Sequence, residues 1–428
     1  MPSKKPELLV PLNGWKTLHN SSTVLDSADA FYFGLQTNFS MRARADNFPI
    51  KDLLKLIEMV HDRGKKCYLT TNILIYNTEM VELYQTIQLA HESGVDAIIC
   101  HDLAAILIAK EVGIPFHVST QANISNLLSA KFYQELGADR LILARELDLN
   151  DIKEIASKLD IPIETFVHGA MCTAVSGRCY LSAELMDFNP DFSANRGKCV
   201  QPCRRNYTLE FTGEENEKID FEPYSGMFFN AKDLCMIGHI SELIEAGISS
   251  FKVEGRMRDP EYIETTAKCY REAIDSYFNG TYSQKRVDEW LSRLSKVFNR
   301  GFHLGFYFSK PGSDDIERTI RGNQAKLRKI QIGKVTNYYP AASAVEVQLF
   351  QNHLEIGDTI IFENKNGFYH KQQVKSLQIE GESITNTKKM STTQPIIVGI
   401  KVSKKIPNTA VIYKFIKKTT SKMKKKID

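Results

Sequence analysis

Eight short, almost wholly apolar runs recur through the first 255 residues of the chain, separated by longer amphipathic stretches. A strand that is apolar on both faces is typical of a parallel sheet covered by helices, because neither face of such a strand can be exposed to water. The runs span residues 7–12, 30–35, 67–73, 97–100, 116–120, 140–145, 164–169 and 250–255.

Most of the intervening stretches end at or near a glycine, which commonly terminates a helix because it adopts the left-handed conformation without strain. One order of elements recurs in HESGVDAIIC, ELGADRLIL and EAGISSFKV: a helix, a glycine, one or two residues and an apolar strand. Eight strands alternating with helices predict an α/β fold, namely a (β/α) barrel of the TIM type. A doubly wound open sheet is the structural alternative.

The alternation is interrupted between residues 183 and 228, where NPDFSANRGKCVQPCRR precedes a polar, acidic segment. A loop of this length inside a compact barrel is usually functional. Because the loop follows the seventh predicted strand, we expect it at the carboxyl-terminal face, where barrel enzymes build their active sites.

A second architecture is predicted after residue 325. Short strands of alternating polarity, beginning with KIQIGKVTNYY, are separated by turn residues, as in a small antiparallel β-barrel. The phrases LEIGDTIIF and KVSKKIPNTAVIYK resemble those in the β-barrels of translation factors. The sequence therefore divides into a barrel domain at 1–310 with cysteine loops at 168–236, a β-barrel domain at 325–416, and a basic tail at 417–428. The tail is expected to be solvated, and an auxiliary contact with RNA or a membrane surface is the alternative.

Composition excludes some classes of protein. The formal net charge is only +4, so the overall charge does not indicate a nucleic-acid binder. No apolar run approaches the roughly 18 residues of a membrane span, and no apolar signal region precedes the first predicted strand. We therefore expect a cytoplasmic protein with no membrane partner. Eight cysteines in 428 residues are too few for a disulfide scaffold.

Five of the eight cysteines fall within 64 residues: Cys172, Cys179, Cys199, Cys203 and Cys235. The spacing C-x6-C followed by C-x3-C matches neither a zinc ribbon nor the compact run of bacterial ferredoxins. Thiols on long loops suit a four-iron cluster, because a cubane needs four thiolates around it. Structural zinc and unligated thiols remain the alternatives at this point.

The run ETFVHGAMCTAVSGRCYLS resembles the signature of peptidase family U-32, the collagenase-like (PrtC-like) proteins. Every position that the signature requires is present, from Glu164 to Ser182. The phrases ELLVPLNG, CHDLAAI, STQANISN, FNAKDLCMI and FKVEGRMR are similar to the same family, so the resemblance covers about residues 6 to 310. Relatives more often read Pro-Ala-Gly where this chain has PLNG, a departure that concerns only the first loop.

The resemblance implies chemistry as well as a fold. Better-understood relatives resemble oxygen-independent hydroxylases that carry a four-iron, four-sulfur (4Fe-4S) cluster and act on tRNA, ribosomal RNA or a ubiquinone precursor. The tRNA and rRNA hydroxylation branch is the nearest, and there the hydroxyl group is expected to derive from prephenate. By resemblance Cys172, Cys179 and Cys199 are cluster ligands. Cys235 is the favoured fourth ligand because AKDLC matches a ligand-bearing phrase, and Cys203 is the alternative.

The function that the resemblance predicts is hydroxylation of RNA, in the first place of the tRNA wobble uridine to 5-hydroxyuridine. The expected partners are tRNA, a small anionic co-substrate such as prephenate and, in an oligomer, a second copy or a family paralogue. The alternatives are a collagenase-like peptidase, a hydroxylase of a quinone precursor and a non-catalytic RNA-binding or assembly factor. Neither Gly-x-Ser-x-Gly nor His-Glu-x-x-His occurs in the chain, and clustered thiols suit one metal site better than one nucleophile.

Lys252, Glu254 and Arg256 alternate along the last predicted barrel strand, so all three are expected to face the mouth of the barrel. Lys252 and Arg256 suit an anionic dicarboxylate, because guanidinium pairs well with carboxylate. Glu254 and Arg256 are accordingly predicted to be catalytic and Lys252 to bind substrate. A buried salt-bridge layer that closes the barrel is the alternative.

Polar residues beyond other strands complete the predicted site. His168 is predicted to donate a proton, and a satisfied structural histidine is the alternative. Arg42 and Arg44 suit an acidic ligand or a solvated loop. Asp102 is assigned to substrate binding but could instead cap the following helix. The remaining residues predicted to bind substrate are Gln121, Asn123 and Arg178.

Overall fold

The computed structural model describes residues 4–20, 22–210, 224–350, 354–387 and 395–418. Most of the predicted basic tail, from residue 419 onward, lies outside this part of the chain. The chain separates into two compact units, Met1–Gly14 with Thr23–Gln324 and Trp15–Ser22 with Ala325–Asp428. The segment Trp15–Ser22, which the sequence-based division leaves in the barrel domain, belongs to the second unit.

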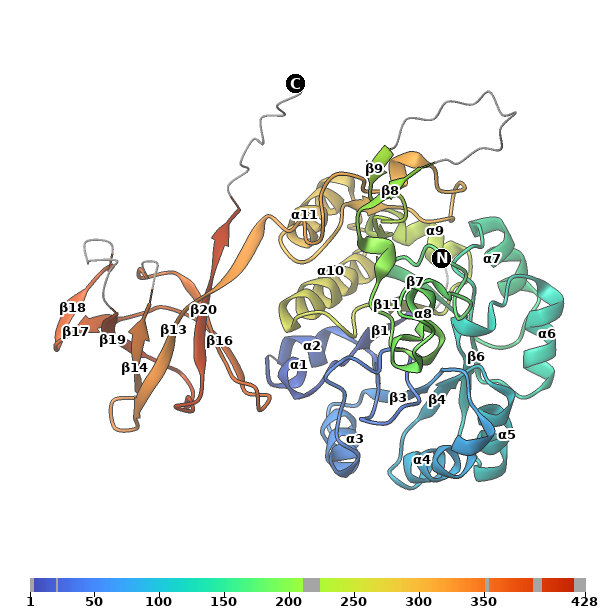
Figure 1. The fold of residues 1–428 in the computed structure, drawn as a ribbon, viewed down its shortest axis with the longest axis horizontal. Coiled ribbons are helices and arrows are strands. Elements are labelled where there is room, and N and C mark those ends of the chain that lie inside the picture. Colours follow the sequence, from blue (N-terminus) through green and yellow to red (C-terminus); the bar gives the residue numbers. More distant parts are fainter. Residues whose placement is uncertain (1–3, 21, 211–223, 351–353, 388–394, 419–428) are drawn as a thin grey trace. The chain divides into compact units, whose positions relative to one another are not determined.

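Eight parallel strands of the first unit form a closed barrel (Figure 1). Each corresponds to one of the eight apolar runs, and the last strand pairs with both the first and the seventh. This second pairing closes the sheet, so the predicted (β/α) barrel is confirmed and the open sheet is wrong. The strands are β1 (Glu7–Pro11), β2 (Ala30–Phe33), β3 (Lys66–Thr71), β4 (Ala97–Cys100), β5 (Phe116–Val118), β6 (Arg140–Ile142), β7 (Ile163–Ala170) and β11 (Ser250–Val253).

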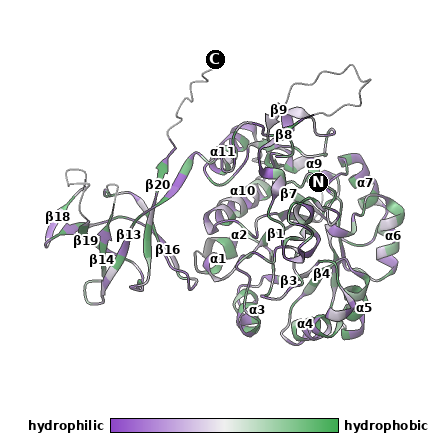
Figure 2. Ribbon diagram, in the orientation of Figure 1, coloured by the Kyte–Doolittle hydropathy of each residue, from purple (hydrophilic) through white to green (hydrophobic). Residues whose placement is uncertain are grey.

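Amphipathic helices surround the barrel and carry both hydrophobic and hydrophilic residues (Figure 2). Their apolar sides are buried, as for Ile263, Ala267 and Ile274 of the longest helix. The helices other than α1 are α2 (Ser22–Ser27), α3 (Leu53–His61), α4 (Met80–Glu92), α5 (Leu103–Val112), α6 (Leu127–Glu135), α7 (Leu149–Ser157), α8 (Leu181–Glu184), α9 (Ile240–Glu245), α10 (Pro260–Phe278) and α11 (Gln284–Leu294). None of the described helices is long and apolar enough to cross a membrane.

A layer of buried charges crosses the interior of the barrel. Glu164 on β7 accepts hydrogen bonds from Lys252 of β11 at 2.8 Å and from Arg140 of β6 at 2.9 Å. Arg140 also forms an ion pair with Glu7 of β1. Burial by itself would raise the pKa of Glu164, but the charges of Lys252 and Arg140 outweigh it and lower the pKa to about 2. The charge layer therefore connects β1, the first strand of the barrel, with β6, β7 and the last strand, β11.

The end of β7 continues beyond the barrel into the cysteine region. There β10 (Asp233–Cys235) runs antiparallel to β7, and β12 (Phe302–His303) pairs with β10. Between β7 and β10 the chain forms α8 and three single turns, followed by the hairpin of β8 (Tyr207–Leu209) and β9 (Tyr224–Gly226). The turns are η4 (Pro190–Phe192), η5 (Ala194–Arg196) and η6 (Pro202–Arg204). The long loop therefore starts at the carboxyl end of the seventh barrel strand, as predicted.

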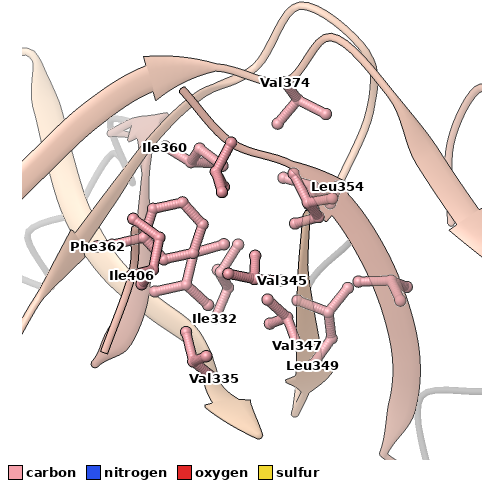
Figure 3. Close-up of a cluster of buried hydrophobic side chains, with 14 of the residues drawn as sticks. Ile332, Val335, Val345, Val347, Leu349, Leu354, Ile360, Phe362, Val374 and Ile406 are labelled. Carbon is pink, nitrogen blue, oxygen red and sulfur yellow. The ribbon is translucent and has the colours of Figure 1, made fainter. Parts of the chain in front are cut away.

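The second unit is an antiparallel sheet of eight strands, in the order β16-β15-β20-β13-β14-β19-β17-β18, together with α1 (Trp15–Asn20). Alternate residues of its strands are buried, and Val345, Ile360 and Phe362 lie in its core (Figure 3). The predicted antiparallel β-structure is thus confirmed. The strands are β13 (Leu327–Tyr339), β14 (Ala344–Leu349), β15 (Thr359–Glu363), β16 (Tyr369–Gln373), β17 (Leu377–Ile379), β18 (Glu382–Ile384), β19 (Ile396–Lys401) and β20 (Val411–Lys417).

Candidate functional site

A cavity of about 60 Å³ lies above the charge layer, at the carboxyl ends of the barrel strands. Lys252, Glu254 and Arg256 all line it, so the common face predicted from their alternation is present. We call this space the inner cavity. Its lining residues are Tyr32, Met41, Arg42, Thr70, Asn72, Ser119, Thr120, Gln121, Ile142, Arg145, Phe166, Lys252, Glu254 and Arg256.

The inner cavity is rich in buried positive charge. Arg256 is 3% exposed, and its guanidinium donates to the neutral oxygens of Ser40, Thr70 and Asn47. Burial lowers the pKa of Arg256 to about 10. Arg145 likewise donates to a neutral acceptor, the carbonyl oxygen of residue 170, at 3.1 Å. A buried cation whose partners are neutral favours an anionic ligand, because the ligand would supply the missing counter-charge.

Glu254 is the carboxylate that faces these cations across the inner cavity. Its side chain forms an ion pair with Arg42 at 3.2 Å. Burial by itself would raise the pKa of Glu254, but the charges of Arg42, Arg258 and Arg145 outweigh it and lower the pKa to about 2. Glu254 is therefore ionised at neutral pH, and a carboxylate with so low a pKa is a weak base.

A second cavity, of about 330 Å³, lies beneath the cysteine loops, and we call it the thiol cavity. Four of the five clustered cysteines line it: Cys172, Cys179, Cys199 and Cys203. Burial raises the pKa of Cys179 and of Cys203. The backbone N–H of Gln201 donates to the sulfur of Cys199 at 3.2 Å. Backbone amides directed at sulfur are typical of sites that hold thiolates.

The two cavities adjoin. Met41, Arg42, Gln121 and Arg145 line both of them. A ligand in the inner cavity would therefore lie beside the group of thiols, with two arginines at the boundary. The barrel mouth and the cysteine loop thus contribute to two adjoining cavities that share these residues.

Close backbone packing seats the cysteine loop on the barrel. Gly197 has a φ of 75°, and a Cβ atom at this position would overlap the carbonyl oxygen of Ser40. Arg204, next to Cys203, donates to the carbonyl oxygens of Met171 and Ala231, and so ties the segment of Cys203 to the segment of Cys172. Small residues and arginine contacts thus bring thiols from two segments together.

Cys235 lies apart from the thiol cavity. It is 4% exposed on β10, and its sulfur is 4.0 Å from the hydroxyl group of Tyr270 on α10. Burial raises its pKa to about 12. The sequence-based preference for Cys235 as the fourth ligand therefore disagrees with the geometry, which groups Cys203 with the other three cysteines.

His168 is also directed away from both cavities. Its ring contacts Tyr262, Tyr270 and Phe302, and burial lowers its pKa to about 3. The cause is a β-bulge, because Lys252 pairs with Phe166 whereas the next residue, Val253, pairs with His168. The bulge turns His168 from the interior face to the helix face of the barrel. His168 lines neither cavity, so this geometry favours the structural alternative over the predicted role of proton donor.

The other predicted substrate-binding residues divide into two groups. Gln121 lines both cavities, and its side-chain oxygen is buried and, in the described part of the chain, without a hydrogen-bond partner. Asn123 instead holds the cysteine loop by donating to the carbonyl oxygen of Ser176 at 2.8 Å. Asp102 caps α5 by accepting from the N–H of Ala104, so the alternative of a helix cap is correct for it.

Arg178 is exposed and lines neither cavity. Arg44 donates to the backbone carbonyls of Lys198 and Asp191 and so holds the cysteine loop as well. Arg145 and Tyr32 also line the inner cavity, but neither was predicted from the sequence as a site residue. Arg145 is the first charged residue after β6, and a polar residue directly beyond a barrel strand is the signal that could have found it.

The donor set is compatible with a group held by four thiolates. Among the residues that the structure describes, no three His, Cys, Asp or Glu side chains form a group that could hold one metal ion. A cubane distributes its four thiolates over four irons, so the sulfurs need not converge on one point. Four thiols around one cavity, with Arg42 and Arg204 nearby to balance negative charge, fit the size and charge of such a group.

Comparisons with known proteins identify the family of the chain. Residues 16–317 match the sequence model of peptidase family U32. An uncharacterised protease of Methanocaldococcus jannaschii is 41% identical over 90% of this chain and 93% of its own length. A collagenase of Porphyromonas gingivalis is 35% identical over 96% of this chain and 98% of its own length. The tRNA hydroxylation protein P1 of Bacillus subtilis is 36% identical over 84% of both chains. The match over most of the chain, together with these identities, shows that the protein belongs to peptidase family U32.

Proposed function

We propose that the protein is an enzyme that hydroxylates tRNA, with a 4Fe-4S cluster in the thiol cavity and an anionic co-substrate in the inner cavity. Relatives named for tRNA hydroxylation support the reaction and the RNA substrate. The observation that carries the proposal is the adjacency of the two cavities, one lined by four thiols and the other by four cations, of which Arg256 and Arg145 donate to neutral oxygens.

Cys172, Cys179, Cys199 and Cys203 are the residues that would hold the cluster. A bound cluster would supply one-electron chemistry at the wall of the site. Arg42 and Arg204 would offset its negative charge, and the N–H of Gln201 would tune it through the sulfur of Cys199. The apolar residues of the thiol cavity, such as Met171 and Phe229, would limit the access of water.

Prephenate, a dicarboxylate, is the co-substrate that we propose; because it is larger than the inner cavity, it would place one carboxylate there and extend into the adjoining thiol cavity. Arg256 and Arg145 would bind its carboxylates, since their present partners are neutral. Glu254 would act by orienting Arg42 at the boundary of the cavities, because its low pKa makes it a poor base. Exchange of a co-substrate hydroxyl group for the hydrogen on C5 of uracil would give 5-hydroxyuridine without an external oxidant.

The geometry fits a cysteine peptidase less well, although one relative is named a collagenase. A nucleophilic cysteine needs a thiolate and a histidine partner. Tyr270 lies between His168 and Cys235, but burial raises the pKa of that thiol to about 12 and lowers that of the imidazole to about 3. This group is buried against α10, and neither His168 nor Cys235 lines the two cavities.

The test is modified-nucleoside analysis of RNA from a deletion strain that carries either wild-type protein or an Arg256→Lys variant. We expect 5-hydroxyuridine to vanish from tRNA on deletion and to return with wild-type protein. Arg256→Lys keeps the charge but loses the planar fork, so it should restore less than a tenth of the modification while retaining wild-type iron content.

Arg286→Lys is the matched control. Its guanidinium also donates to two hydroxyl oxygens, those of Ser276 and Thr281, but on α11 outside both cavities. Unchanged 5-hydroxyuridine in the deletion strain would refute the RNA substrate, and a quinone precursor that accumulates there would favour the quinone alternative. Protein purified without oxygen that contains zinc and no iron would refute the cluster.

A further inference from the structure

The charge of the chain is divided unevenly between its two regions. Residues 325–428 contain 19 Lys and Arg against 7 Asp and Glu, a net charge of +12. Because the whole chain carries +4, residues 1–324 carry −8. The low overall charge is therefore the sum of a strongly basic second unit, which we call the β unit, and an acidic barrel unit. A polyanionic substrate gains affinity from the first and is repelled by the second.

Part of this positive charge lies on one surface of the β unit. Lys375 follows β16, Lys401 ends β19, and Lys404 and Lys405 lie in the connection from β19 to β20. All four side chains are exposed, and we call this surface the lysine edge. No acidic residue occurs in the sequence of 364–379 or of 395–418, which supply the edge.

Hydrogen bonds hold the two segments of the lysine edge together. The N–H of Lys401 donates to the hydroxyl oxygen of Ser376 at 3.1 Å, and Gln372 donates to the carbonyl oxygen of Lys401 at 2.8 Å. Ser403 contacts both Gln372 and His370, at 3.2 Å each. The lysines therefore project from ordered backbone, next to hydroxyl and amide side chains of the kind that contact phosphate oxygens.

We propose that the lysine edge binds the phosphate backbone of the RNA substrate. The choice of RNA as the ligand rests on the proposed function, whereas the lysine edge itself is observed independently of it. RNA is favoured over a membrane because the edge combines lysines with hydrogen-bonding side chains. Lys404 also lies over the ring of Phe368, 5.7 Å from its centroid, which places an aromatic face beside the charges.

The test uses the full chain with a triple Lys401→Gln, Lys404→Gln, Lys405→Gln substitution. We expect the Kd for unmodified tRNA to rise at least roughly ten-fold at physiological salt. The slope of log K against log salt should fall by about 2 to 3, because each lost phosphate contact removes about 0.7 to 0.9. Iron content should equal that of wild type, and in the reaction KM should rise while kcat stays unchanged.

The control is a triple Lys51→Gln, Lys110→Gln, Lys153→Gln substitution, which removes the same charge from exposed positions of the barrel unit. It should leave Kd within about two-fold, since these lysines are remote from the edge in the sequence and belong to the acidic unit. Equal losses in both triple variants would refute the edge, because the effect would then follow net charge alone.

Further outcomes separate this inference from the proposed function. If the edge variant binds and hydroxylates tRNA like wild type, the lysine edge is wrong and the function stands. If the edge variant loses tRNA binding but wild type produces no hydroxylated nucleoside, the edge stands and the function falls. Loss of binding to anionic lipid vesicles, with tRNA binding unchanged, would overturn the proposal in favour of a membrane.

Discussion

At the level of single residues, the site depends on which side of the barrel wall a side chain faces. Glu164 and Phe166 of β7 face the interior, whereas the bulge directs His168 to the helix side, beside Tyr270. Cys235 of β10 pairs with His168 of β7 and lies on the same outer side of the barrel wall. One extra residue in one strand thus separates two chemically reactive side chains from the cavities.

The assignment of the fourth thiol is testable by iron content. Cys203→Ser should lose most of the iron of protein purified without oxygen, as should Cys172→Ser, because each removes a thiolate from the thiol cavity. Cys235→Ser should keep it, and buried Cys67→Ser is the matched control. Iron and the visible absorbance of the cluster would be measured per chain. Loss of iron in Cys235→Ser with retention in Cys203→Ser would reverse the assignment.

The buried histidine predicts a pH dependence of stability. Burial lowers the pKa of His168 from 6.5 to about 3, so between these values the unfolded chain binds a proton that the folded protein does not. Stability therefore falls on acidification, by up to about 1.4 kcal/mol per pH unit. His168→Phe retains the ring contacts and removes this dependence, so the variant should gain stability relative to wild type between pH 7 and 5.

Denaturant unfolding at several pH values measures the difference between His168→Phe and wild type. A constant difference would show that the imidazole does not titrate on unfolding. On the proposed function the variant should also retain hydroxylation activity, because His168 lines neither cavity. A hundred-fold loss of kcat with an unchanged fold would restore the catalytic role that the sequence indicates.

At the level of elements, the cysteine loop is a folded insertion seated on the barrel. Gly197 packs against the backbone of Ser40, and Asn123 holds the carbonyl oxygen of Ser176. Ser40 in turn accepts a hydrogen bond from Arg256 in the inner cavity. The loop, the segment after β2 and the end of β11 are therefore positioned by one another.

A methyl group at Gly197 should disturb this seating. Gly197→Ala would force the loop away from Ser40, so we expect iron content and hydroxylation to fall by more than ten-fold with little change in helix content. Gly113→Ala is the matched control, because its φ is also positive, at 82°, but a Cβ there meets nothing within 4 Å. Each alanine costs about 1 kcal/mol of backbone strain. Equal iron content in both variants would contradict the seating.

At the level of the whole molecule, the barrel is closed by charges as well as by backbone pairing. Glu164 binds Lys252 and Arg140, which are 88 and 24 residues away in sequence. Arg140 reaches Glu7 at the start of the barrel. These contacts join the first, sixth, seventh and last strands, so the layer links the end of the barrel sequence to its beginning.

Removal of the central carboxylate should destabilise the barrel. Glu164→Gln leaves buried Lys252 without its counter-charge and Arg140 with Glu7 alone, and we expect the free energy of unfolding to fall by about 3 to 5 kcal/mol. Glu154→Gln, which breaks an exposed pair with Lys158 on α7, should change it by no more than about 0.5 kcal/mol. Denaturant unfolding followed by circular dichroism measures both. A Glu164→Gln variant as stable as wild type would show that backbone pairing alone closes the barrel.

The sequence by itself determined the elements of this protein. Apolar runs, amphipathic stretches and terminal glycines are local signals, so all eight barrel strands and the antiparallel β unit could be placed from them. The family resemblance also rested on contiguous residues around Cys172 and Cys179, and the alternation of Lys252, Glu254 and Arg256 indicated their common face.

Only the tertiary structure decided which residues meet at the site. The position of Cys235 outside the thiol cavity depends on a bulge, because a one-residue shift in strand pairing reverses the face of every later side chain, including that of its partner His168. The position of Arg145 at the boundary of both cavities depends on where a loop from β7 folds back. Neither leaves a periodic signal in the chain, because cavities form between segments distant in sequence, whereas helices and strands form within one segment.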